Sequence, residues 1–126
     1  MAIFEVKVSA YFSAAHSLRG YKGKCEATHG HNWKVQVTLT STRLDELGMV
    51  IDFSLVKKGL AVVLDQLDHT FLNKLAYFRK RNPTSENIAC FIYARLSSRL
   101  SHAKIKLVEV SVWETRDSCA TYRGQE

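Results

Sequence analysis

The sequence predicts an α+β fold in which a four-stranded antiparallel sheet carries two helices on one face. Two observations predict this class. Apolar and polar residues alternate near both ends of the chain, as in strands, and apolar residues recur at intervals of three and four in two central segments, as in helices. The expected order is ββααββ, and 126 residues with a 46% hydrophobic share suit a single domain over residues 1–126.

The first two strands are expected at residues 3–16 and 29–40, joined by a loop that contains two glycines. Apolar side chains occupy the even positions of the first segment and the odd positions of the second, from Val35 to Leu39. Because successive side chains of a strand point to opposite faces, these two sets are expected to share the core face of one hairpin.

Helical spacing marks the two central segments. The first helix is expected over residues 53–67, with Asp52 or Ser54 as its N-cap, and the second over residues 85–100, with Thr84 as its N-cap. The buried stripes predicted from the spacing are Phe53, Val56, Leu60, Val63, Leu64 and Leu67 in the first helix, and Ile88, Ile92 and Leu96 in the second.

The last two strands are expected at residues 104–115 and near residues 120–124. Alternation in the longer segment runs through Val108, Val110 and Val112, which are therefore predicted to face the core.

Composition indicates the kind of environment that suits the chain. Cys25, Cys90 and Cys119 stand at wide, unequal spacing, which favours reduced thiols over a disulfide framework. The sequence shows no apolar run long enough to span a membrane and no signal-peptide pattern, so a cytoplasmic protein is expected. The formal net charge of +6 can attract nucleic acid or a polyphosphate, although an ordinary solvated surface also explains it.

Three histidines form the first candidate site. His29 and His31 stand two apart on the core-facing parity of the second strand, and His16 has the core-facing parity of the first strand. The three imidazoles are expected to meet at one end of the hairpin. Three nitrogen ligands leave one position open, which is the pattern of catalytic zinc. The alternative is a set of core or turn histidines satisfied by hydrogen bonds.

Cys25 is the second candidate. It precedes the histidine pair in a loop with Lys22 and Lys24, and neighbouring cations or a metal lower the pKa of a thiol. A thiolate there can act as base or nucleophile. The alternative is a small buried filler, which is the role expected of Cys90.

Three more polar side chains are candidates. Asp68 can orient His69 and stabilise its protonated form, although a histidine that interacts with the dipole at a helix C-terminus would look the same. Glu114 has the parity of Val110 and Val112, so its carboxylate needs partners and can accept hydrogen bonds from a ligand with paired N–H groups. If the strand ends earlier, Glu114 is solvated.

Six segments together resemble the 6-pyruvoyltetrahydropterin synthase family, and they run in order over nearly the whole chain. The spacing of Cys25 from the histidine pair, C-x3-H-G-H, resembles the carboxy-forming branch of that family, while Thr28 replaces a leucine that is common there. The six segments are FSAAH ending at His16, KCEATHGHN at 24–32, GMVIDF at 48–53, LDHTFLN at 67–73, NPTSEN at 82–87 and ETRDSCATYRG at 114–124.

The resemblance implies roles for the candidate residues. It implies the tunnelling fold, assembled through trimers into a homohexamer with active sites at subunit interfaces. The residue roles that it implies are zinc bound by His16, His29 and His31, catalysis by Cys25 with Asp68 and His69, and binding of the pterin by Glu114 with Thr84 and Ser85 lining the pocket.

The resemblance also implies a reaction. Zinc-dependent conversion of 7,8-dihydroneopterin triphosphate would give 6-carboxy-5,6,7,8-tetrahydropterin, acetaldehyde and triphosphate, a step of queuosine biosynthesis. Alternatives within the family are a pyruvoyl-forming reaction and cleavage of sepiapterin. Basic side chains that can steer the triphosphate are Lys22, Lys24, Arg79, Lys80 and Arg81.

Two alternatives lie outside pterin chemistry. The first is a small basic nucleic-acid-binding module, which the charge allows, but no aromatic residue interleaves the basic run at 79–81. The second is a protein that holds a metal for structure alone, which would be expected to have a closed four-ligand site.

Overall fold

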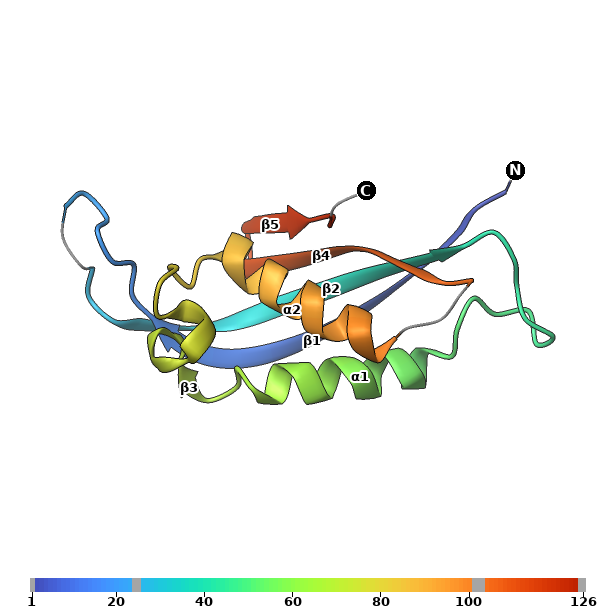
Figure 1. Ribbon diagram of the computed structural model, residues 1–126, viewed down its shortest axis with the longest axis horizontal. Coiled ribbons are helices and arrows are strands. Elements are labelled where there is room, and N and C mark those ends of the chain that lie inside the picture. The colour runs from blue at the N-terminus through green and yellow to red at the C-terminus, as the bar shows by residue number, and fades with distance from the viewer. Residues whose placement is uncertain (1, 24–25, 101–103, 125–126) are drawn as a thin grey trace.

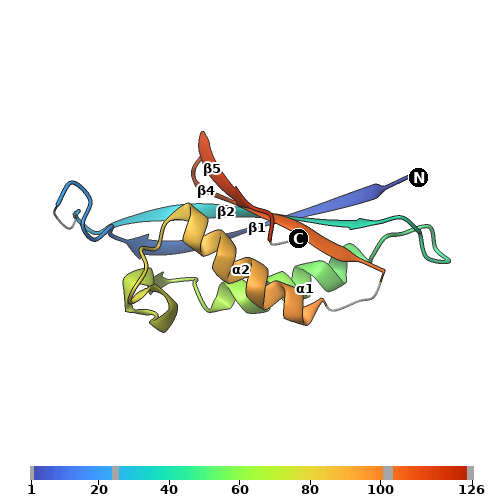
Figure 2. The same ribbon diagram turned by 45° about the horizontal axis from the view of Figure 1, so that its top comes forward.

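The computed structural model describes residues 2–23, 26–100 and 104–124, and it shows one sheet with both helices on the same face (Figures 1 and 2). The five strands have the spatial order β3-β1-β2-β4-β5. The predicted α+β class is confirmed. The strands are β1 (Phe4–His16), β2 (His29–Ser41), β3 (Thr70–Phe71), β4 (Lys106–Thr115) and β5 (Ser118–Tyr122), and the helices are α1 (Phe53–Asp65) and α2 (Ser85–Arg99).

The short strand β3 is the element that periodicity did not predict. It pairs in parallel with β1, Ala14 opposite Thr70, so the sheet is mixed rather than purely antiparallel. Two residues are too few to show an alternation. Two single-turn 3-10 helices, Leu72–Lys74 and Ala76–Phe78, follow it.

The long β1–β2 hairpin has the predicted parity. Its antiparallel register runs from Phe4 opposite Ser41 to His16 opposite His29. Even-numbered β1 residues and odd-numbered β2 residues face the helices. Those that are buried are Val8, Phe12, Ala14 and His16 on β1, and Trp33, Val35, Val37, Leu39 and Ser41 on β2.

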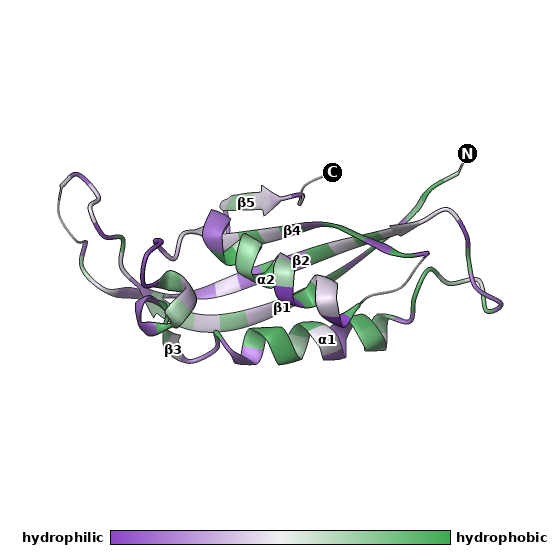
Figure 3. Ribbon diagram, viewed as in Figure 1, coloured by the Kyte–Doolittle hydropathy of each residue, from purple (hydrophilic) through white to green (hydrophobic). Residues whose placement is uncertain are grey.

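Both helices begin at the predicted caps. Asp52 accepts a hydrogen bond from the backbone N–H of Ser54, and the Thr84 hydroxyl accepts one from the backbone N–H of Asn87. Phe53, expected in the buried stripe of α1, is instead exposed. The remaining stripe residues pack against the sheet, and Figure 3 shows apolar and polar residues interspersed along α1 and the strands.

A β-bulge in β4 changes which of its residues face the core from those that were predicted. Thr38 lies opposite Glu109 and Leu39 opposite Leu107, so Val108 is an extra residue in β4. Leu107, only 7% exposed, takes the core position instead of Val108. The prediction for Val108 was wrong because one inserted residue moves the β4 residues that precede it to the face opposite the predicted one.

Beyond the bulge, Val110 and Val112 are buried as predicted. A second irregularity follows where β4 meets β5. Trp113 lies opposite Cys119 and Thr115 opposite Ser118, which leaves Glu114 as the extra residue. Bulges redirect side chains, and this one lies at the end of the core row. No helix in the described part of the chain is both long and apolar enough to cross a membrane.

Candidate metal centre

Three histidines and one glutamate converge on the helix-covered side of the sheet, at the end where β1 leads into the loop before β2. His16 ends β1, His29 begins β2 and His31 follows two residues later, while Glu114 comes from the far end of β4. One possible ligand atom from each of the four residues lies within 4.8 Å of the other three. The antiparallel register causes this meeting, because it sets His16 directly opposite His29.

A single carboxylate oxygen, Oε1 of Glu114, contacts the three imidazoles. It lies 2.9 Å from Nε2 of His31, 3.2 Å from Nε2 of His16 and 3.7 Å from Nε2 of His29. The contact with His31 does not have hydrogen-bond geometry, and Nε2 of His31 is a buried nitrogen without a hydrogen-bond partner among the described residues. Such a nitrogen is a natural metal ligand.

Backbone carbonyls orient the other two rings. Nδ1 of His16 lies 2.8 Å from the carbonyl oxygen of Pro83, and Nδ1 of His29 lies 2.9 Å from that of Ala27. If each Nδ1–H donates to its carbonyl, each neutral ring presents the Nε2 lone pair to the centre, as in histidine ligands of metals. The two Nε2 atoms are 3.0 Å apart, and two lone pairs repel at that distance unless they share a proton or a cation. The donor set therefore fits a metal ion.

The two half-buried histidines have opposite pKa shifts. Burial lowers the pKa of His31, and Glu114 only partly offsets this, so the ring of His31 is favoured in its neutral, metal-binding form. The hydrogen bond to the carbonyl of Ala27 is the main cause that raises the pKa of His29.

Trp33 forms the wall between this cluster and the core, a role that sequence reasoning did not assign. It is fully buried, and its ring meets those of His16 and His31 edge-on, with centroids 4.9 Å and 5.5 Å away. Its indole N–H donates to the carbonyl of Ala14 at 3.2 Å. The odd parity of Trp33, shared with His31 and Val35, is the sequence signal that would have placed it there.

Two asparagines fix the backbone that follows His16. Asn73 accepts from the N–H of Ser17 at 3.0 Å and donates to its carbonyl at 2.8 Å. Asn82 does the same with Arg19, at 2.8 Å and 3.0 Å. Each amide thus pairs with the backbone as a neighbouring strand would. The LDHTFLN and NPTSEN segments contain these asparagines, but no role was predicted for either residue.

Asp68 and His69 do face each other, although they are adjacent in sequence. Oδ2 of Asp68 lies 3.0 Å from Nδ1 of His69, and Oδ1 accepts a hydrogen bond from the N–H of Ser13 at 2.8 Å. That backbone bond is the main cause that lowers the pKa of Asp68, and His69 adds to it. His69 has a φ of 58°, and its side chain is 82% exposed. The pair lies outside the four-residue cluster.

The remaining predicted residues are distributed as follows. Cys25 and Lys24 lie outside the described residues. Ser85 lines a hollow of about 170 Å³ beside Glu114, while the hydroxyl of Thr84 caps α2. Cys90 is half-buried, and burial raises the pKa of its thiol, which suits a filler.

Fold and site together define a class: a small α+β protein whose sheet gathers three imidazoles and a carboxylate into a candidate metal centre. The family model described as 6-pyruvoyl tetrahydropterin synthase matches residues 5–125. The chain belongs to this family, and it is accordingly an enzyme of the pterin synthase type.

Individual relatives agree with the family model. A putative 6-carboxy-5,6,7,8-tetrahydropterin synthase of Archaeoglobus fulgidus is 40% identical over 94% of both chains. A 6-carboxy-5,6,7,8-tetrahydropterin synthase of Synechocystis is 40% identical over 88% of this chain and 86% of its own. The 6-pyruvoyl tetrahydropterin synthase structure of Caenorhabditis elegans superposes with a TM-score of 0.85 at 31% identity, over 99% of this chain and 98% of that chain.

Proposed function

We propose that the chain is a zinc-dependent lyase that converts 7,8-dihydroneopterin triphosphate into 6-carboxy-5,6,7,8-tetrahydropterin and releases acetaldehyde and triphosphate. The cluster of His16, His29, His31 and Glu114 is the observation that carries the proposal, because its nitrogen donors suit zinc. The relatives from Archaeoglobus and Synechocystis are named as carboxy-forming enzymes, the former as a putative one. Their similarity to this chain favours pterin chemistry over nucleic-acid binding.

In this proposal the three histidines hold the zinc, which when bound supplies Lewis-acid polarisation of side-chain oxygens of the substrate. Cys25, as a thiolate, removes a proton from that side chain. His69 donates or accepts a proton in the next step of the reaction. Asp68, whose Oδ2 lies 3.0 Å from Nδ1 of His69, holds the ring in one orientation.

Glu114 has a specific place in the proposal. Its side chain is 36% exposed, and it borders both the histidines and the hollow lined by Ser85, Ser118 and Ala120. From there its carboxylate can accept hydrogen bonds from the amino-pyrimidinone edge of a pterin, with Thr84 and Ser85 at the start of α2 lining the pocket.

A homo-oligomer, trimer-based and hexameric, completes the proposal. His69 is exposed and belongs to no part of the cluster in its own chain, which suits a residue that acts on substrate held by another chain. A cytoplasmic location and a step in queuosine biosynthesis remain part of the same proposal.

The decisive experiment incubates zinc-assayed protein with 7,8-dihydroneopterin triphosphate and identifies the products by mass spectrometry, with Cys25→Ala alongside. We expect 6-carboxytetrahydropterin and acetaldehyde from the parent protein. The Cys25→Ala variant should retain zinc and lose most turnover; full activity would remove Cys25 from the mechanism.

The second candidate is the pyruvoyl-forming reaction, which the likeness to the Caenorhabditis elegans structure favours. A pyruvoyl product in the same assay would replace the carboxy-forming assignment. Turnover of sepiapterin without turnover of the triphosphate substrate would point to cleavage of sepiapterin. No turnover by a zinc-loaded, assembled protein would overturn the proposal.

A further inference from the structure

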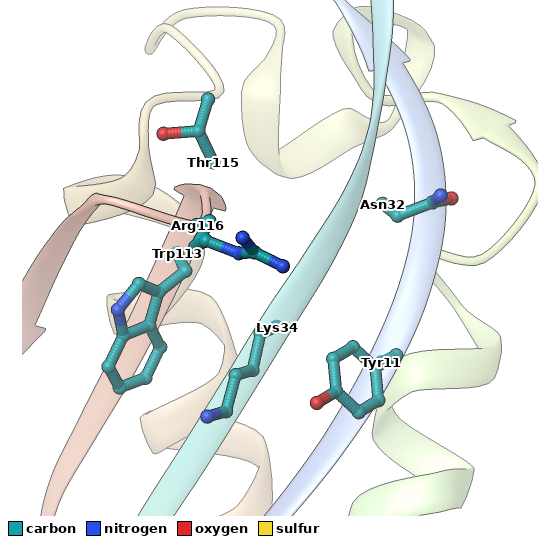
Figure 4. Close-up of a pocket in the computed structure, with 6 residues that line it drawn as sticks. All are labelled: Tyr11, Asn32, Lys34, Trp113, Thr115 and Arg116. Carbon is teal, nitrogen blue, oxygen red and sulfur yellow. The ribbon is translucent and has the colours of Figure 1, made fainter.

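A separate hollow lies on the face of the sheet that the helices leave uncovered (Figure 4). Its volume is about 390 Å³, and residues of β1, β2 and the end of β4 line it. Strand alternation explains its polar character, since Lys34 stands between the buried Trp33 and Val35 and points the other way. The lining residues are Tyr11, Asn32, Lys34, Trp113, Thr115 and Arg116.

Two cations share this hollow without a carboxylate among its lining residues. Figure 4 shows the guanidinium of Arg116 over β2 on the same side as Lys34, with the hydroxyl of Tyr11 directed toward Lys34. Nζ of Lys34 lies 4.9 Å from the ring centroid of Trp113, a cation–π contact that limits the freedom of the lysine. Within the described ranges neither cation forms an ion pair, so both charges are available to a ligand.

The hollow and the candidate metal centre lie back to back. Asn32 follows His31 and Thr115 follows Glu114, so neighbouring residues contribute to opposite faces of the sheet. The β2–β4 pairing begins only at Lys34 opposite Trp113, which leaves the start of β2 without β4 beside it in the described structure. A shallow depression there is lined by both His31, which belongs to the candidate metal centre, and Asn32, which also lines the hollow.

We propose that the hollow between Lys34 and Arg116 binds an oligophosphate, and that this is the triphosphate group of the proposed substrate. A guanidinium binds two phosphate oxygens at once, an ammonium adds a point charge, and the Tyr11 hydroxyl adds a neutral donor. The identity of the anion as part of the substrate rests on the proposed function. The presence of an oligophosphate site does not.

The first test uses inorganic triphosphate and the zinc-loaded protein in isothermal titration calorimetry. The double variant Lys34→Gln/Arg116→Gln should bind it about tenfold more weakly or worse, because two charge-assisted contacts are lost. The control Lys57→Gln/Arg99→Gln removes the same charge from exposed helix positions and should keep the parent affinity. Equal affinities in the two double variants would overturn the site.

The second test separates the two sources of the anion. For 7,8-dihydroneopterin triphosphate the Lys34→Gln/Arg116→Gln variant should lower kcat/KM about tenfold or more, since the two cations bind the group that the reaction releases. An unchanged kcat/KM together with lost binding of inorganic triphosphate would overturn the assignment to the substrate. If the parent protein turns over no pterin but its binding of triphosphate needs both cations, the proposed function fails and the site stands.

Discussion

At the scale of single residues, the role of Glu114 distinguishes a closed structural metal site from an open catalytic one. As a fourth ligand it would close the metal centre, as structural sites are closed, whereas as a pterin anchor it leaves the fourth position open. The Glu114 side chain is 36% exposed and lines the hollow beside Ser85, so it can reach a bound ligand, and this position favours the anchor.

We therefore expect Glu114→Gln to keep stoichiometric zinc, measured by atomic emission, and to weaken pterin binding by about tenfold or more, because hydrogen bonds to a charged acceptor are the stronger ones. Titration of tryptophan fluorescence with a product pterin measures the affinity. A variant that loses its zinc would instead make Glu114 a ligand.

Asn82 is expected to act on the metal through His16. It pairs with both backbone groups of Arg19, and the next residue, Pro83, supplies the carbonyl that orients His16. Partners of this kind change metal affinity by about 10–100-fold when they are lost. Asn82→Ala should show such a loss in competition with a zinc chelator.

Loss of stability alone must be separated from loss of positioning. Val63→Ala removes core packing from α1, a helix that contributes no residue to the histidine cluster, and serves as the control. It should lower the urea midpoint and keep the zinc affinity. If Val63→Ala and Asn82→Ala weaken zinc equally, Asn82 has only a structural role.

Asp68 gives a prediction for the pH dependence of stability. Its carboxylate has a lowered pKa in the folded protein, so it stabilises the fold above the pKa of the unfolded chain, and this contribution is lost as the pH falls through the lower, folded value. Asp68→Asn should lower the urea midpoint at pH 6 and match the parent protein well below pH 3.8. A gap between the two midpoints that is the same at both pH values would contradict this linkage.

At the scale of elements, the start of α2 combines a structural and a proposed binding role. Thr84 caps the helix through the N–H of Asn87 at 3.1 Å. Thr84→Ala should lower the free energy of unfolding by about 1 kcal/mol in urea titrations, whereas Thr84→Ser should keep most of it because serine caps equally well. Equal stability of the Ala and Ser variants would show that the cap does not contribute.

The bulges show how one element sets the geometry of another. Val108 is inserted into β4 opposite β2, and Glu114 is inserted opposite β5. Without the second irregularity, the alternation of β4 would continue past Glu114 into a regular hairpin. The site glutamate therefore stands where the ladder is interrupted, a position that bulges often occupy beside active sites.

At the scale of the whole molecule, exposed apolar side chains gather at the end opposite the histidines. They surround a hollow of about 410 Å³ between the start of β1 and the start of α1, and such patches mark interfaces. The exposed large apolar residues that line this hollow are Phe4, Leu44 and Phe53, and the exposed Ile3, Leu47 and Leu55 lie within three residues of them in the sequence.

We expect sedimentation velocity to show an oligomer of three or six chains, since homo-oligomers form closed symmetric assemblies. Leu47→Glu, which places a charge in the patch, should shift the equilibrium toward smaller species. A parent protein that sediments as a fully active monomer would contradict the assembly and the intersubunit role of His69.

Features that depend on neighbours along the chain could be predicted from the sequence. Alternation defined the hairpin and the parity of His16, His29 and His31, and cap residues defined the helix starts. Features that depend on distant segments became visible only in the folded chain: the parallel strand β3, Leu107 in place of Val108, and the paired amides of Asn73 and Asn82. The contact of Glu114 with His16 joins residues 98 positions apart. Local periodicity reports which face a side chain occupies, whereas bulges and converging side chains arise only when separate strands and loops pack together.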